Sequence, residues 1–240
     1  MDEKYLLYID VLGFSELVKS DSKRVDEIYQ IIDSLNVHMH PDFNTIVFSD
    51  TILVYNNANF KSCSDREYIV MYLCEFAQNL MYRLIGSGMF FRAILSFGDF
   101  QHYKLRNIEA FYGTVLINSY NDEKDINCCG LLIDKECQKY NKIFPTGSYN
   151  KDYDFVYLNQ NLEDLLHNSF GFVSRDTISH YLCNISKYIL NDFKYLQEIY
   201  YLMYKHPNPK IRSKHLETWR LYHLRYCSIL DYLVETNFQI

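Results

Sequence analysis

The chain has 240 residues, of which 48% are hydrophobic and 22% are charged, and its formal net charge is −6 at pH 7. This balance is typical of a globular protein and excludes a largely disordered chain. The mild acidity also argues against a general nucleic-acid binder, because duplex affinity comes largely from Lys and Arg side chains on phosphates.

The N-terminal segment MDEKYLLYID is too short and too acidic for a signal peptide. The sequence has no apolar run of about 18 residues, the length that a transmembrane helix needs. The seven cysteines are odd in number and show no CxxC spacing, which favours reduced thiols. We therefore expect a cytoplasmic protein with no membrane partner. Cys128 and Cys129 are either a redox pair or two small apolar residues near a strand, and we favour the second interpretation.

The first elements alternate between strand and helix. Residues 4–13, KYLLYIDVLG, predict a buried strand, and a helix follows directly in GFSELVKS. Residues 24–39 carry apolar side chains at helical spacing and predict a second helix. Residues 45–55, TIVFSDTILVY, predict a hairpin that turns at Ser49 and Asp50.

Two helix starts carry capping signals. Ser15 is the N-cap candidate for the helix that follows the first strand. Ser64 and Glu67 have the spacing of a capping box at the start of a long amphipathic helix over residues 64–88, and Gly86 is expected to stop that helix.

The next elements complete the core. Residues 89–100 predict a strand, residues 112–125 a short helix and residues 130–134 another strand. The order of strand, helix, hairpin, helix and strand is close to the ferredoxin-like βαββαβ plan, with additions. We therefore predict an α+β fold with an antiparallel or mixed sheet.

The pattern changes after the core. Residues 142–154 predict a loop, residues 175–205 one long helix, and residues 210–235 a second helix after the breaker HPNP. We expect a catalytic domain over residues 1–172 and a C-terminal helical extension over residues 173–240, packed on the core or on a dimer.

Two acids interrupt apolar strands. Asp10 ends the first strand, and Asp50 lies at the tip of the hairpin. In a βαββ arrangement the first strand lies beside this hairpin, so the two carboxylates can converge. Such a pair repels unless a cation lies between, and its oxygen atoms suit Mg²⁺ or Mn²⁺. Asp50 alone is also an ordinary turn residue, whereas a buried acid such as Asp10 needs a partner.

The turn after Asp10 leads straight into a helix N-terminus. Backbone N–H groups and the helix dipole favour a phosphate at that point. Gly13 lets the backbone approach a ligand closely. A glycine before a helix is common, but directly after a metal-binding acid it indicates a cradle for a triphosphate.

Arg92 stands among apolar residues in MFFRAILSFG. Taken alone, it is either a snorkelling residue of an edge strand or an anion ligand. With two acids and a phosphate-binding turn predicted nearby, we favour the ligand.

Four stretches in this order resemble the class III nucleotidyl cyclases: YIDVLGF, FSDTILVY, FRAILSFGDF and YGTVLINSY. The resemblance covers roughly residues 4–140 and implies a ferredoxin-like core with two metal-binding acids. Within the family the chain is most similar to the bacterial pyrimidine cyclases of the Pycsar anti-phage systems. This narrower resemblance depends on IDVLGF, the FSD hairpin, RAILSFG, GTVLINSYNDEKDINCCGLLID and KIRSKHLETWRLYH.

The resemblance implies roles for the first strand and its turn. Asp10 and Asp50 would hold two Mg²⁺ or Mn²⁺ ions, and the backbone carbonyl of Ile9 would complete one metal shell. The turn residues would bind phosphates through their backbone: Leu12, Gly13 and Phe14.

The late helix departs from the family. Asn118 matches the transition-state Asn, but the residue four positions on, where the family has an Arg, is Asp122. The transition-state cation would then come from Lys124 or from Arg92, the basic residue near the phosphates, or else activity is impaired.

The base-reading positions also differ. Adenylyl cyclases read the purine with a lysine upstream of the hairpin acid and an acidic residue before the late helix. Asn44 and Ala110 align with these positions, and neither supplies a charged purine contact. Glu109 is next to Ala110, so a shift of one residue would change the second match. The two residues favour a smaller base.

Two further pairs are candidates. Lys135 and Lys139 follow the strand GLLID. They are either ordinary surface lysines, which we favour, or one of them reaches a phosphate from outside, with Lys135 as our candidate. His38 and His40 in HMHPD form either a metal site or a solvated loop, and we favour the loop.

A basic patch in the last helix comprises Arg212, Lys214 and Arg220. The simpler interpretation is a solvated helix face, with Leu216 and Trp219 packing inward.

The sequence therefore predicts a pyrimidine nucleotide cyclase that converts UTP to 3′,5′-cyclic UMP and diphosphate by attack of the ribose 3′-OH. A cytidylate cyclase is the second choice, and a purine cyclase or an inactive nucleotide-binding scaffold are further alternatives. The resemblance implies a homodimer with sites at the interface, and a separate effector that the cyclic product activates. A palm-type polymerase is disfavoured because the chain lacks a basic surface for nucleic acid.

Overall fold

The computed structural model describes residues 2–35, 40–57 and 59–239. Contacts between residues divide the chain into two compact units. The first comprises Met1–Arg83, Met89–Ile126 and Gly130–Leu158. The second comprises Leu84–Gly88, Asn127–Cys129 and Asn159–Ile240. Our expectation of a catalytic domain over residues 1–172 stays a prediction.

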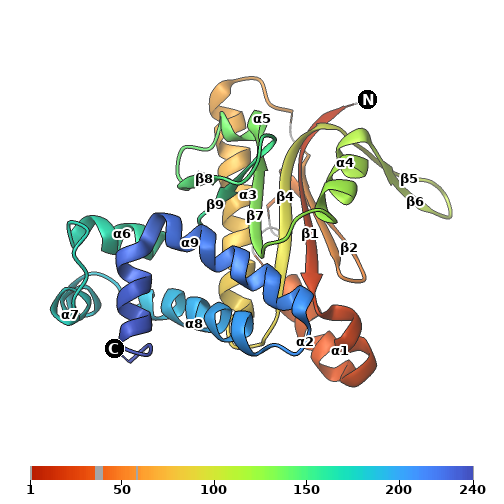
Figure 1. Cartoon of the computed structure of the whole chain (residues 1–240). Helices are drawn as coiled ribbons and strands as arrows, with labels where there is room; N and C mark the ends of the chain where they lie inside the picture. Colours follow the sequence, from red (N-terminus) through yellow and green to blue (C-terminus); the bar gives the residue numbers. More distant parts are fainter. Residues whose placement is uncertain (1, 36–39, 58, 240) are drawn as a thin grey trace. The chain divides into compact units, whose positions relative to one another are not determined.

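The first unit is built on a seven-stranded sheet (Figure 1). Its strands are β1 (Glu3–Leu12), β2 (Phe43–Phe48), β3 (Thr51–Asn56), β4 (Phe90–Asp99), β7 (Gly130–Asp134), β8 (Thr146–Ser148) and β9 (Tyr153–Val156). They lie in the order β2-β3-β1-β4-β7-β9-β8, and all neighbours are antiparallel except β4 and β7. The sheet is therefore mixed, as the sequence predicted.

The first four strands form the predicted ferredoxin-like core. Between them run three helices: α1 (Phe14–Ser20), α2 (Ser22–Asp33) and α3 (Cys63–Leu84). This βαββαβ order with β1 and β3 at the centre of β2-β3-β1-β4 confirms the α+β prediction. The helix expected over residues 24–39 ends at Asp33, and residues 36–39 lie outside the described residues.

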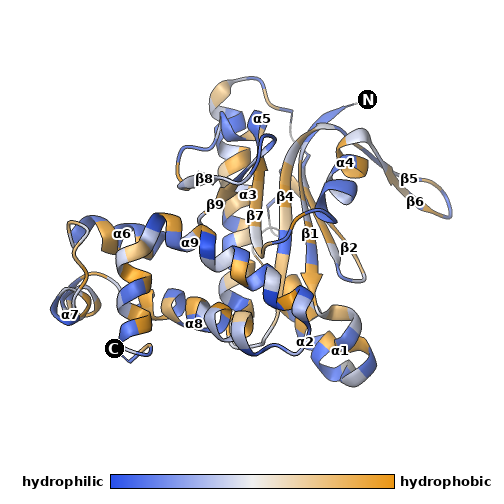
Figure 2. Cartoon of the chain, viewed as in Figure 1, coloured by the Kyte–Doolittle hydropathy of each residue, from blue (hydrophilic) through white to orange (hydrophobic). Residues whose placement is uncertain are grey.

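Side chains alternate between the two faces of β1. Leu6 and Tyr8 pack with Val115 of α4 (Thr114–Glu123) in one apolar cluster. Tyr5, one position earlier, accepts a hydrogen bond from Arg66 of α3 at 3.1 Å, so α3 covers the opposite face. Figure 2 shows the central strands as mainly hydrophobic, which fits a sheet covered on both sides. By the same alternation, Asp10 lies on the α4 face.

Both predicted N-caps are wrong by a few residues. Gly13, not Ser15, is the N-cap of α1, because the chain enters the helix directly from the turn. For α3 the capping pair is Ser62 and Asp65: the Asp65 N–H donates to Ser62 Oγ at 3.1 Å, and Asp65 Oδ2 accepts from the Ser62 N–H at 2.9 Å. This helix starts at Cys63, so Ser62 is the residue just before it.

Short strands were missed. Residues 142–154, expected to be a loop, contain β8 and the start of β9, which pair with each other and extend the sheet from β7. A two-stranded hairpin of β5 (Gln101–Lys104) and β6 (Glu109–Tyr112) was not predicted either. Strands of three or four residues are too short to show a clear alternation, and pairing decides them. The short helix α5 (Lys135–Gln138) follows β7.

The second unit is helical. Its main helices are α6 (Gln160–Asn168), α7 (Arg175–Asn184), α8 (Ile189–Lys205) and α9 (Pro209–Glu235). The prediction of a single helix over residues 175–205 is wrong, because the helix is interrupted between α7 and α8. There Ser186 Oγ donates to Asn161 Oδ1 at 3.1 Å and accepts from the Tyr188 N–H, which replaces helical backbone bonds. In the part of the chain that the structure describes, no helix is long and apolar enough to cross a membrane.

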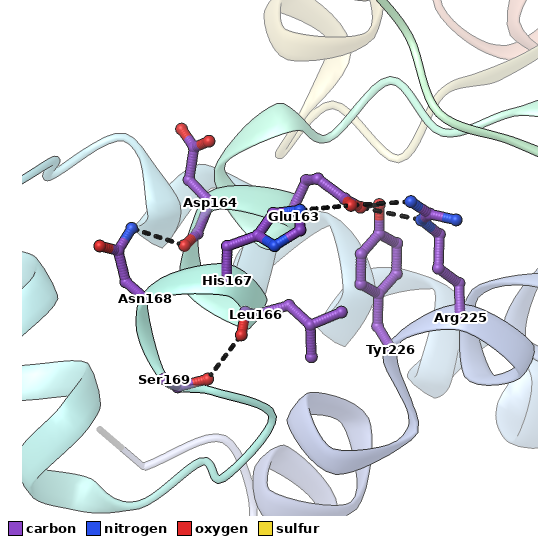
Figure 3. A network of polar contacts seen from close by, with 8 residues as sticks. All are labelled: Glu163, Asp164, Leu166, His167, Asn168, Ser169, Arg225 and Tyr226. Atoms are coloured by element: carbon purple, nitrogen blue, oxygen red, sulfur yellow. Dashed lines mark hydrogen bonds and ion pairs between the residues drawn. The ribbon is translucent and has the colours of Figure 1, made fainter.

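A polar network joins α6 to α9 (Figure 3). Glu163 accepts two hydrogen bonds from Arg225, at 2.8 and 2.7 Å, and one from the Tyr226 hydroxyl at 3.1 Å. These bonds, led by those from Arg225, hold the pKa of Glu163 below its usual range. Tyr226 has non-helical backbone angles, so the network lies at a kink of α9.

Cys128 and Cys129 belong to this second unit and are each 1% exposed. Their burial agrees with the interpretation as small apolar residues near a strand.

Candidate functional site

The structure brings the backbones of Asp10 and Asp50 together. Asp10 is the cross-strand partner of Thr51, the residue after Asp50. The Val11 N–H donates to the Asp50 carbonyl oxygen at 2.9 Å, so the hairpin tip is fastened to the end of β1. Antiparallel pairing of β1 with β3 is the cause, since it lays the end of β1 beside the start of β3.

The pKa of Tyr8 is raised by burial and by the charges of both Asp10 and Asp50. Its side chain is buried and lies two residues before Asp10, on the same face of β1. Burial is the main cause that raises the pKa of the Tyr8 phenol; a hydrogen bond with the Thr51 side chain lowers it, and the charges of Asp10 and Asp50 raise it further. Sequence reasoning missed Tyr8, although the two-residue period of a strand would have found it.

The guanidinium of Arg92 forms an ion pair with the carboxylate of Asp10. The two residues are cross-strand partners in β4 and β1, and Arg92 Nη2 is 2.8 Å from Asp10 Oδ2. The same Nη2 is ion-paired with the carboxylate of Glu123, whose side chain is 8% exposed. Glu123 was not predicted. A signal was available, because an acid in the last turn of a helix opposes the helix dipole and needs a cation nearby.

Arg92 also closes the C-terminal end of α4. Its Nη1 donates to the carbonyl oxygens of Glu123 at 3.2 Å and Ile126 at 3.3 Å. The carbonyl of Glu123 belongs to the last residue of α4, and that of Ile126 lies just beyond the helix, where backbone carbonyls lack the helical hydrogen bond. Arg92 thus links the end of β1 to the end of α4.

The turn after β1 has the geometry that only glycine adopts easily. Gly13 has φ +84° and is the N-cap of α1. A Cβ placed on Gly13 would meet no atom within 4 Å, so the space above this backbone is open. Phe14, the next residue, is buried and anchors the helix start, while Leu12 is half-buried.

The donor set near the end of β1 fits a hard divalent cation. Asp10 and Asp50 supply carboxylate oxygens, and Ile9, which is fully buried between β3 and β4, would supply a backbone carbonyl. The described residues contain no group of three or more His, Cys, Asp or Glu side chains arranged for a metal. Mg²⁺ sites with one or two carboxylates, completed by water and phosphate oxygens, are common in phosphoryl-transfer proteins.

The predicted base-reading residues lie on two different hairpins. Asn44 of β2 donates to the Tyr55 hydroxyl at 2.9 Å, and Tyr55 is hydrogen-bonded to His102 of β5. His102 Nε2 is in turn 3.0 Å from Glu109 of β6, which precedes Ala110. Sequence reasoning missed Tyr55 and His102. This polar chain connects Asn44 to the hairpin that carries Ala110.

On α4, Asn118 is exposed. Asp122 accepts a hydrogen bond from the Tyr153 hydroxyl of β9 at 2.5 Å. Lys124 Nζ lies 3.8 Å from the centre of the Tyr120 ring. Asp122 is therefore hydrogen-bonded to strand β9, and Lys124 contacts Tyr120 of α4.

The two lysines after β7 are exposed and ion-paired. Lys135 Nζ is 2.5 Å from Asp154 Oδ1, and Lys139 is ion-paired with Glu136, three residues before it. Such surface pairs are weak, so a phosphate can compete for either lysine.

The histidine pair is only partly described. His38 lies outside the described residues, and His40 Nε2 is 2.7 Å from the Tyr68 hydroxyl.

The basic patch of α9 is mostly engaged within its own unit. Arg212 donates to the carbonyl of His206 at 2.8 Å, and Arg220 is ion-paired with Glu217. Trp219 packs on Tyr200, with 5.0 Å between the ring centres. The expectation that Leu216 packs inward is wrong, because it is 57% exposed.

A scan of protein-family models and a search of curated proteins found no match to this sequence. Solved structures do resemble the chain. The adenylyl cyclase CyaB from P. aeruginosa is similar over 65% of this chain and 93% of its own, with 11% identity and a TM-score of 0.47.

Two eukaryotic structures give similar values. The guanylyl cyclase domain of the RhoGC fusion protein from the aquatic fungus Blastocladiella emersonii matches over 66% of this chain and 97% of its own, with 10% identity and a TM-score of 0.48. An adenylate cyclase from Trypanosoma brucei matches over 65% and 87%, with 10% identity and a TM-score of 0.45. Likenesses at this level establish no activity for this chain.

Proposed function

We propose that the protein is a nucleotidyl cyclase that acts on a nucleoside triphosphate. The single observation that carries this proposal is the meeting of Asp10 and Asp50 beside the left-handed turn at Gly13. Two acids next to an open helix start offer oxygen ligands for a divalent cation and backbone donors for a phosphate chain.

Asp10, Asp50 and the carbonyl of Ile9 are the groups that would hold one or two Mg²⁺ or Mn²⁺ ions. When bound, such ions would neutralise the triphosphate and make the ribose 3′-OH more acidic. The backbone of Leu12, Gly13 and Phe14 would orient the β- and γ-phosphates. Their N–H groups lie at the positive end of α1.

In the proposed reaction the ribose 3′-oxygen forms a bond to the α-phosphorus, in line with the bond that breaks to release diphosphate. The 3′-OH proton passes to solvent. Arg92 would add positive charge near the phosphates, Lys135 would reach a phosphate after leaving Asp154, and Asn118 would orient the ribose from α4.

For the base we propose a pyrimidine, with UTP first and CTP second. Asn44 and Ala110 are uncharged, whereas a purine reader of this family carries a lysine and an acid at these positions. A neutral amide such as Asn44 can both donate and accept a hydrogen bond at a pyrimidine edge.

We also propose a homodimer. The β5–β6 hairpin exposes several large apolar side chains, among them Leu105 at 50%, Ile108 at 60% and Tyr112 at 48%. A second copy of the chain would cover them and complete the site. A role of the cyclic product as a messenger that activates a separate effector in anti-phage defence has only the resemblance in sequence to support it.

The test is an incubation with Mn²⁺ and each of the four nucleoside triphosphates, with cyclic product and diphosphate measured by mass spectrometry. We expect cyclic UMP from UTP, and none from the Asp50→Ala variant. Consumption of ATP or GTP instead would make the enzyme a purine cyclase. The absence of turnover with any of the four would overturn the proposal of an enzyme.

A second candidate, a catalytically inactive nucleotide-binding scaffold, is favoured by one observation. The acid Asp122 stands where the family has its transition-state arginine, and it is hydrogen-bonded to Tyr153. Nucleotide binding without turnover, equal in wild type and Asp50→Ala, would support this candidate.

A further inference from the structure

Three charged side chains lie in a row between β1 and α4. The guanidinium of Arg92 is 2.8 Å from the Asp10 carboxylate and is also ion-paired with Glu123. The side chains of Arg92 and Glu123 are 12% and 8% exposed, so water screens these charges little. Asp10 has a role in the proposed reaction, whereas Glu123 has none.

The guanidinium of Arg92 makes more contacts at the end of α4 than with β1. On the α4 side it contacts the Glu123 carboxylate and two carbonyl oxygens, those of Glu123 and Ile126. On the β1 side it contacts the carboxylate of Asp10 at 2.8 Å. A cation that binds Asp10 therefore lies near a guanidinium that also contacts Glu123 and Ile126 at the end of α4.

The charge of this row matters for any cation at Asp10. A fixed positive charge beside Asp10 repels a divalent cation, and the negative charge of Glu123 offsets that repulsion. With Glu123 charged, part of the repulsion between Arg92 and the cation is offset, and the site keeps more of the attraction that Asp10 and Asp50 exert on the cation. Without the charge of Glu123, the cation meets the repulsion of Arg92 in full.

We propose that Glu123 is a positioning residue that draws the charge of Arg92 toward α4 and thereby sets the affinity of the Asp10–Asp50 site for a divalent cation. This inference rests on the cation site of the proposed function. Glu123 would act through Arg92, without binding the cation or touching the substrate itself.

The experiment measures Mn²⁺ binding to the full chain without nucleotide, by the electron paramagnetic resonance signal of free Mn²⁺. Glu123→Gln keeps the size of the side chain and removes its charge. We expect its dissociation constant for Mn²⁺ to rise at least tenfold. The double variant Arg92→Gln, Glu123→Gln removes both charges, and its dissociation constant should return to within about threefold of wild type.

Glu163→Gln is the matched control. It removes the acid of a second glutamate–arginine pair, that of Glu163 and Arg225 in the second unit, which is more exposed than the pair of Glu123 and Arg92 (Figure 3). We expect it to lower thermal stability, as Glu123→Gln also will, but to leave Mn²⁺ binding unchanged.

The outcomes separate the two proposals. Wild type that binds no Mn²⁺ would overturn the cation site itself, and with it the proposed function. Wild type that binds Mn²⁺ while Glu123→Gln binds it equally well would overturn only the role of Glu123, and would leave it a purely structural residue. If Glu123→Gln does not fold, the double variant decides, because a tenfold weaker affinity in that neutral pair would contradict the charge argument.

Discussion

Asp10 and Arg92 face each other across β1 and β4, and their side chains meet at 2.8 Å. Because cross-strand partners leave the sheet on the same face, the register of the two strands sets this contact. The pair explains how an acid is kept in an otherwise apolar strand, since a buried carboxylate needs a charged or hydrogen-bonding partner. It also means that Asp10 has a structural partner besides any cation.

Asp10→Asn should separate the two roles of Asp10. The amide keeps the size of the side chain and an oxygen that accepts from Arg92, so we expect the melting temperature to change by only a few degrees. Turnover should fall at least 100-fold, because the amide binds a divalent cation poorly. Asp26→Asn, an exposed acid of α2, is the control and should keep full activity. Equal turnover in Asp10→Asn and wild type would contradict the metal role.

Gly13→Ala tests the phosphate turn. The positive φ of Gly13 disfavours alanine by about 1 kcal/mol, although the added methyl group meets no neighbour. Gly88→Ala is a matched control, since Gly88 has φ +73° and equally open surroundings. Both variants should lose similar stability in urea unfolding, but only Gly13→Ala should raise the KM for the nucleotide. A similar KM increase in both would show that the effect is general destabilisation.

Ile108→Asp tests the proposed dimer. Ile108 lies in the turn between β5 and β6 and is 60% exposed. A charge in an apolar interface is costly, so sedimentation should show mostly monomer, with turnover at least tenfold lower. Leu224→Asp, in α9 at 67% exposure, is the control and should leave both unchanged. An Ile108→Asp variant that remains fully dimeric would exclude this hairpin as the contact.

The stability of the second unit should fall in acid because of His215. Burial lowers the pKa of His215 to about 4, from an ordinary value of 6.5. The unfolded chain therefore binds a proton that the folded chain does not, and stability is lost as the pH falls from 6.5 toward 4. We expect His215 to account for about 2 kcal/mol of lost unfolding free energy between pH 7 and pH 5.

The fluorescence of Trp219, the single tryptophan, reports on the same helix during urea unfolding. His215→Leu should remove this share of the pH dependence. A wild type and a His215→Leu variant with the same slope between pH 7 and pH 5 would contradict the assignment.

Much of the fold was predictable from periodicity. β1, the hairpin of β2 and β3, α3 and β4 each have enough residues to show an apolar period, and all four were predicted. The errors lie where local pattern is weak. Helices α7 and α8 were predicted as one helix, because both sequences are typical of helices. In the structure the helix is interrupted between them, where the Ser186 hydroxyl donates a hydrogen bond to Asn161.

For the site, the sequence was informative about single positions and less so about partners. Asp10, Asp50 and Gly13 were chosen because each is unusual where it stands. Tyr8, Tyr55 and Glu123 were not chosen, because a tyrosine in a strand and an acid in a helix are ordinary in isolation. Tyr8, Tyr55 and Glu123 matter because of the residues that the fold places beside them.

The sequence by itself determined that an acid lies near the end of the first strand and that a glycine turn and a helix follow, because strand period and turn chemistry are local properties. The strand runs two residues past Asp10, to Leu12, because pairing with β4 continues that far. Only the tertiary structure decided that Asp10 meets Arg92, 82 positions further along the chain, and that Glu123 joins them. Strand register and the packing of α4 on the sheet create these contacts. Both depend on pairing between distant segments, which local preferences do not specify.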